Sequence, residues 1–121
     1  MILADTSIWI DHFRRGDAEL ARLLEEGQIA MHPFVIGELA CGSLARREEV
    51  LWMLAQQPKV PEARHDEVLA LIEQRQLAGK GLGWVDLHLL TAALLGGHQL
   101  WTRDGRLRDV AETFRARPFA R

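Results

Sequence analysis

The sequence contains a single cysteine and no long apolar run. Cys41 stands alone among 121 residues, which excludes an internal disulfide and a zinc site built from several thiolates. We interpret Cys41 as a small buried residue, because unpaired cysteines are usually packed in the core; a nucleophilic role is the alternative. No apolar run reaches the ~18 residues that a membrane-spanning helix needs. Asp5 precedes every Lys and Arg, so the basic start of a signal peptide is also missing, and we expect a cytoplasmic protein.

Lysine is scarce, and the overall charge is slightly negative. Lys59 and Lys80 are the only lysines among fifteen basic residues, and the formal net charge is −2 at pH 7. This balance argues against a broad basic surface for nucleic acids but allows a local one. Arginine suits bidentate phosphate contacts, although a coding bias explains the same skew. A hydrophobic fraction of 48% and a charged fraction of 26% are ordinary for a globular protein, and the length predicts one domain over residues 1–121.

Short apolar segments alternate with amphipathic ones along the chain, with no repeat or linker between them. The spacing predicts helices over 46–56, 65–76 and 107–114, a helix capped by Asp17, one that follows Pro33, and a buried one from Asp86 to Gly96. Predicted strands are Ile2–Ala4, Ile29–Met31, His98–Thr102 and an edge strand near Pro118–Ala120. This alternation is typical of βαβ units, so we expect an α/β protein with helices on both faces of a short, mostly parallel sheet. Right-handed crossovers then place the carboxyl ends of the parallel strands at one edge, where ligands bind.

Three carboxylates stand alone in segments that the core should bury. Asp5 is the only charged residue among the first ten, and Glu38 and Asp86 are each the only one over about twenty positions. An isolated buried carboxylate protonates, pairs with a cation or binds a metal. Asp5 and Asp86 precede helical patterns and are candidate N-caps, whereas Glu38 does not stand at a helix start. Capping, a distant arginine and a metal ion therefore all remain as explanations.

Asp104 joins this group through the predicted topology. Alone it is ambiguous, because Asp-Gly is a common turn, but strand alternation puts Thr102 and Asp104 on one face. The topology brings all four acids toward the same sheet edge. Carboxylates a few ångströms apart repel by ~4 kcal/mol per pair at an effective dielectric of 20, so they need cations between them. Ligands that are all oxygen select Mg²⁺ or Mn²⁺, and such ions bind phosphodiesters and activate water.

With these acids in place, the chain resembles the PIN-domain ribonucleases, and within them the VapC-type toxins of prokaryotic toxin–antitoxin pairs. The segments that carry the resemblance, in order over nearly the full length, are LADTS, GEL around Glu38, GWVDLHLL around Asp86 and LWTRDGRL around Asp104. The resemblance implies a three-layer α/β/α PIN-like domain that works as a Mg²⁺- or Mn²⁺-dependent endoribonuclease on structured RNA, such as tRNA or ribosomal RNA. It also implies a homodimer and a VapB-type antitoxin whose C-terminal segment blocks the site. By the same resemblance, the metal ligands, direct or through water, are Asp5, Glu38, Asp86 and Asp104, assisted by Thr6 or Ser7 and by Thr102.

Two other functions stay open. Haloacid-dehalogenase-like phosphatases and receiver domains use a strand-end Asp as a nucleophile. However, the phosphatases have a second Asp where Ser7 stands, and the receivers need a late Lys that this chain lacks. The second alternative is a non-catalytic RNA-binding module with a PIN-like fold, although a carboxylate cluster does not favour binding beside phosphates.

The remaining candidates are weaker. His88 lies roughly 200° around the helix from Asp86, so we expect it to pack rather than to bind metal. The segment GKGLG, residues 79–83, is similar to a phosphate loop but lacks the Walker order, and we interpret it as a flexible connection that could touch RNA. Candidates for phosphate contact are Arg14, Arg15 and Arg103.

Overall fold

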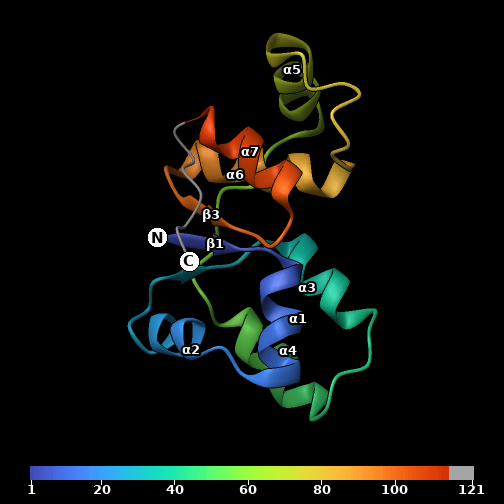
Figure 1. The fold of residues 1–121 in the computed structure, drawn as a ribbon. Helices are drawn as coiled ribbons and strands as arrows, with labels where there is room; N and C mark the ends of the chain where they lie inside the picture. The colour runs from blue at the N-terminus through green and yellow to red at the C-terminus, as the bar shows by residue number, and fades with distance from the viewer. Residues whose placement is uncertain (115–121) are drawn as a thin grey trace.

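The computed structural model describes residues 1–114, which form three short strands and seven helices (Figure 1). The strands are β1 (Ile2–Ala4), β2 (Ile29–Ala30) and β3 (Gln99–Trp101). The helices are α1 (Thr6–Arg15), α2 (Ala18–Glu25), α3 (Pro33–Ala40), α4 (Arg47–Ala55), α5 (His65–Arg75), α6 (Trp84–Gly96) and α7 (Gly105–Glu112). The edge strand predicted near Pro118–Ala120 lies outside the described residues.

The sheet is parallel, with the order β2–β1–β3. β1 is the central strand, and its Leu3 pairs with Ala30 on one side and Leu100 on the other. All three residues of β1 are buried, as expected of a parallel strand that is covered on both faces. Beyond β2, Met31 forms an isolated parallel bridge with Lys59, so the segment after α4 extends this side of the sheet.

Helices flank the sheet on both sides, which confirms the three-layer α/β/α class. α6 and α7 pack beside β3, whereas α1 and α2 pack beside β1 and β2 (Figure 1). α6 is buried without interruption from Leu87 to Ala93, as its almost entirely apolar sequence predicted. None of the helices in the described part of the chain is long and apolar enough to cross a lipid bilayer.

Two expectations about individual residues are wrong. α6 begins at Trp84, two residues before Asp86, with Gly83 as its N-cap. From inside the first turn, the Asp86 carboxylate reaches back to accept a hydrogen bond from the Gly83 amide (Oδ2–N 3.1 Å), which satisfies a donor at the helix start. Cys41 is exposed rather than buried, because α3 ends at Ala40 and Cys41 lies beyond its last turn.

Candidate active site

Asp5 follows β1 directly and caps the N-terminus of α1. Its Oδ1 accepts hydrogen bonds from the amides of Ser7 (3.0 Å) and Ile8 (3.4 Å) and from the Ser7 hydroxyl (2.5 Å). Its Oδ2 accepts one from the Thr102 hydroxyl. Asp5 is only 6% exposed; this burial raises the pKa of its carboxyl, and the hydrogen bonds offset part of the rise. Asp5 is therefore both a helix cap and a buried acid held in one orientation.

Asp104 caps α7 at the end of the segment that follows β3. Its Oδ1 accepts hydrogen bonds from the amides of Arg106 (2.9 Å) and Leu107 (3.5 Å). The Asp104 amide donates to the Thr102 hydroxyl oxygen (3.0 Å), so Thr102 connects Asp5 with the backbone of Asp104. Thr102 is 3% exposed, so its hydroxyl contacts the Asp5 carboxylate and the Asp104 amide from the buried side of the site.

Glu38 and Asp86 approach the same place from α3 and α6. The Thr6 hydroxyl donates to Glu38 Oε1 (2.6 Å), and the Gly83 amide holds Asp86 as described above. Burial raises the pKa of the Asp86 carboxyl, and the negative charges of Asp104 and Glu38 raise it further. The charges of Asp104 and Glu38 therefore act on the Asp86 carboxyl.

The four acids line one pocket of about 220 Å³ at the carboxyl ends of the strands. We call it the acidic pocket; its walls are Asp5, Thr6, Ser7, Glu38, Asp86, Leu89 and Asp104. The structure thus brings together the four acids that the topology placed at this edge. Their chemical roles stay predictions.

The donor atoms of the acidic pocket suit a hard divalent cation. In Glu38, Asp86 and Asp104, one carboxylate oxygen accepts a hydrogen bond, while the other has no hydrogen-bond partner within residues 1–114. As placed, no three His, Cys, Asp or Glu side chains of that range could hold one ion together. Mg²⁺ commonly takes one or two carboxylates and keeps several waters, and no thiolate competes in the pocket, so the residues fit such an ion.

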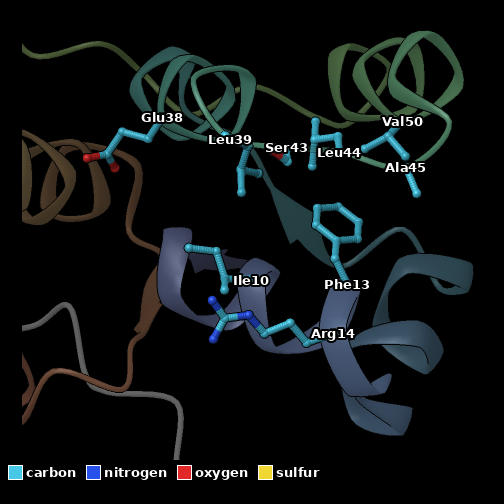
Figure 2. Close-up of a pocket in the computed structure, with 10 residues that line it drawn as sticks. Ile10, Phe13, Arg14, Glu38, Leu39, Ser43, Leu44, Ala45 and Val50 are labelled. Atoms are coloured by element: carbon cyan, nitrogen blue, oxygen red, sulfur yellow. The ribbon is translucent and has the colours of Figure 1, made fainter.

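An apolar groove of about 400 Å³ runs beside the acidic pocket (Figure 2). Glu38 lines both cavities, so the groove and the acidic pocket meet at this side chain. Sequence reasoning missed the groove, although Ile10 and Phe13, three apart on α1 and both exposed, were the available signal. Its other walls include Arg14 of α1 and, on the opposite side, Leu39, Ser43, Leu44, Ala45 and Val50.

The arginines predicted to contact phosphate differ in their surroundings. Arg103 forms ion pairs with Asp11 (Nε–Oδ2 2.9 Å) and Asp17 (Nη2–Oδ2 3.2 Å), so its charge connects the end of β3 to α1 and the start of α2. Arg15 also pairs with Asp11 (3.3 Å). Arg14 lines the apolar groove.

His88 packs, as expected, and does not face the acids. Its ring lies between Phe34 and Trp84, with centroid separations of 4.8 Å and 4.6 Å. The imidazole is 6% exposed, and burial lowers the pKa of His88.

Comparison with known proteins identifies the family of the chain. The model of the PIN domain family matches residues 2–113. The chain belongs to the PIN domain family. Two Mycobacterium tuberculosis proteins named Ribonuclease VapC32, from strains CDC 1551 / Oshkosh and ATCC 25618 / H37Rv, are each 52% identical to it over 109 residues, or 89% of this chain and 88% of theirs. The resemblance to PIN domains of the VapC type is therefore confirmed.

A solved structure shares the PIN fold at low sequence identity. The crystal structure of PAE2754 from Pyrobaculum aerophilum aligns with a TM-score of 0.63 and 19% identity, covering 97% of this chain and 81% of that one. At this identity the likeness supports the fold alone.

Proposed function

We propose that this PIN-domain protein is an endoribonuclease toxin of the VapC type, which hydrolyses phosphodiester bonds of structured RNA such as tRNA or ribosomal RNA. The observation that carries the proposal is the acidic pocket, where four carboxylates from separate elements line one small cavity. The name Ribonuclease VapC32 of the two relatives supports RNA as the substrate.

We further propose Mg²⁺ or Mn²⁺ as the cofactor, held by Asp5, Glu38, Asp86 and Asp104 directly or through water. When bound, such an ion polarises the phosphate and lowers the pKa of a water. Burial raises the pKa of Asp86 most, and the negative charges of Asp104 and Glu38 raise it further; a bound divalent cation would neutralise part of this negative charge.

The supporting residues fix the acids before substrate arrives. Ser7 and Thr102 hold the Asp5 carboxylate, and Thr6 holds Glu38, so little reorganisation is needed on binding.

The partners follow from the same assignment. We propose a VapB-type antitoxin, a homodimer and a cytoplasmic setting. The apolar groove shares Glu38 with the acidic pocket, so an antitoxin segment lying in the groove would reach the carboxylates and block them.

The test compares two Asp→Asn variants on total cellular RNA. Asp86→Asn removes a charge from the acidic pocket and should reduce cleavage by about 100-fold or more. Asp66→Asn is the matched control, because Asp66 also lies in the first turn of a helix but is exposed and paired with Arg64. EDTA should abolish wild-type cleavage, and mapping of the new 5′ ends identifies the target. EDTA-resistant cleavage, or full activity of Asp86→Asn, would overturn the proposal.

The two alternatives make different predictions. An Asp-nucleophile enzyme would form an acyl phosphate on Asp5, but the two oxygens of this carboxylate accept four hydrogen bonds, which opposes its use as a nucleophile. A non-catalytic RNA-binding module would bind RNA without binding Mn²⁺ in calorimetry.

A further inference from the structure

A second charged pocket, of about 380 Å³, lies between the end of α5 and one face of α7. Arg75 of α5, Lys80 of the following loop and Arg106 of α7 line it, and Asp109 is the one acid among its walls. We call it the basic pocket. None of its three cations forms an ion pair with another residue of the range 1–114. Three cations against one carboxylate leave a local positive excess on a protein whose net charge is −2.

The glycine-rich segment 79–83 shapes this pocket. The Arg106 side chain lies across Gly81, with Nη1 and Cδ at 2.8 Å and 2.9 Å from the position that a Cβ would take. The backbone φ of Gly81 is +81°, a conformation that side-chain-bearing residues rarely adopt. The backbone conformation therefore favours glycine, and a Cβ at this position would displace the flexible Arg106 side chain that lies over the loop.

Arg75 is also held in place. Its guanidinium carbon lies 4.6 Å from the centroid of the Phe114 ring, a cation–π contact that restricts the side chain. A guanidinium stacked on a ring still presents its N–H groups around its edge, and the planar fork matches phosphate oxygens.

The basic pocket adjoins the acidic pocket through two shared segments. The Arg106 amide donates to Asp104 Oδ1 (2.9 Å). At the other end of the glycine-rich segment, the Gly83 amide donates to Asp86 Oδ2 (3.1 Å). The segments that carry Lys80 and Arg106 of the basic pocket thus also hold Asp86 and Asp104 of the acidic pocket.

The charged side chains of the acidic pocket are all negative, so the positive charge of the basic pocket would be important for RNA binding. A divalent cation at the four carboxylates would attract the phosphate to be cleaved, and the neighbouring phosphates of the strand need cations beside the acidic pocket. Arg103, the cation nearest in sequence to Asp104, is already paired with Asp11 and Asp17. The cations of the basic pocket, which form no ion pair within residues 1–114, are available for this purpose.

We propose that the basic pocket of Arg75, Lys80 and Arg106 binds a backbone phosphate of the RNA strand next to the cleavage site. The identity of the ligand rests on the proposed function. Phosphate contacts fix the register of a nucleic acid and carry no sequence information, so the basic pocket positions RNA and does not select a base.

The test measures RNA binding as a function of salt in the Asp86→Asn background, in which cleavage should be slow enough for the RNA to stay intact. The probe is a fluorescent, mixed-sequence single-stranded RNA of about 12 nucleotides, followed by anisotropy. Each phosphate contact contributes about 0.7 to the slope of log K against log salt, so R75A/K80A/R106A, which loses the one phosphate bound in the basic pocket, should lower the slope by about 0.7. The control triple R22A/K59A/R64A also removes two arginines and one lysine, all exposed, and should leave the slope unchanged.

Gly81→Ala separates local geometry from net charge. It keeps every charge but displaces the Arg106 guanidinium, so the slope should fall by at most about 0.7, the value for the one phosphate in the pocket. Circular dichroism checks that each variant is folded. An unchanged slope in R75A/K80A/R106A would overturn the proposal, and so would an equal decrease in the control triple, because net charge alone would then explain the effect.

Failure of the basic pocket and failure of the proposed function give different results. If the wild-type chain cleaves RNA but R75A/K80A/R106A binds with the wild-type slope, the function stands and the basic pocket is wrongly assigned. If the wild-type chain cleaves no RNA while the slope still depends on the basic pocket, the pocket is correctly assigned and the nuclease function is wrong.

Discussion

Replacing Thr102 with Val removes one hydroxyl that connects two acids of the acidic pocket. That hydroxyl donates to Asp5 Oδ2 and accepts from the Asp104 amide (3.0 Å). Val has nearly the same shape, and the site is 3% exposed, so water cannot replace the lost partner. A hydrogen bond to a charged group contributes about 1.5–3 kcal/mol, and an unsatisfied amide costs about 1 kcal/mol. Thr102→Val should therefore lower the free energy of unfolding near pH 7 by about 3 kcal/mol, or the Tm by about 10 °C.

The size of this loss should depend on pH. Burial raises the pKa of the Asp5 carboxyl, and the Thr102 hydrogen bond opposes the rise, so Val raises the pKa further. A carboxyl whose folded pKa lies above its unfolded value of 3.8 costs stability as pH rises through the interval between the two values. In Thr102→Val this interval extends to higher pH. The difference from wild type should thus be smaller near pH 4, where the unsatisfied Asp104 amide still contributes about 1 kcal/mol, and complete above the raised pKa.

Urea unfolding between pH 4 and pH 8 measures both effects. Thr102→Ser is the matched control, because it keeps the hydroxyl and loses only a methyl group, and it should retain most of the stability at every pH. If the loss in Thr102→Val were the same at pH 4 and pH 8, or if Thr102→Ser lost as much, the hydroxyl would not have the role assigned to it.

Two further predictions concern other titratable groups. Asp86→Asn removes a carboxyl whose pKa is raised by burial and by two neighbouring acids. In thermal unfolding, this variant should be more stable than the wild type at pH 8 but not at pH 4. An unchanged pH dependence of the stability would contradict this. His32 Nδ1 accepts a hydrogen bond from the Phe34 amide (2.9 Å), and burial, followed by the charge of His88, lowers the pKa of His32 to about 4. Because the pKa of His32 is lower in the folded than in the unfolded chain, the free energy of unfolding of the wild type should fall by up to about 3 kcal/mol as the pH falls from 6.5 to about 4. His32→Asn keeps a capping oxygen and should remove most of this acid sensitivity, which unfolding curves at pH 4 and pH 7 measure.

Sequence patterns were sufficient to predict most of the elements and the edge at which the acids gather. The apolar run Ile2–Ala4 indicated a buried strand, and the lone acids Asp5, Glu38 and Asp86 followed from charge patterning. Parallel pairing then required the strand ends to share an edge, which the structure confirms. These inferences succeeded because they depend on local periodicity and on a topological rule that holds for nearly all such folds.

How the acids are held, and what surrounds them, emerged only from the folded chain. The contacts of Thr102 with Asp5 and of Thr6 with Glu38 join residues 97 and 32 positions apart, and no local pattern encodes such pairs. The same holds for the pairing of Arg103 with Asp11, the apolar groove and the passage of Arg106 over the glycine-rich segment. The start of α6 at Trp84, where the Asp86 carboxylate accepts from the Gly83 amide, was also not evident from the sequence. Side-chain orientation depends on packing between distant segments, and it exists only once the chain has folded.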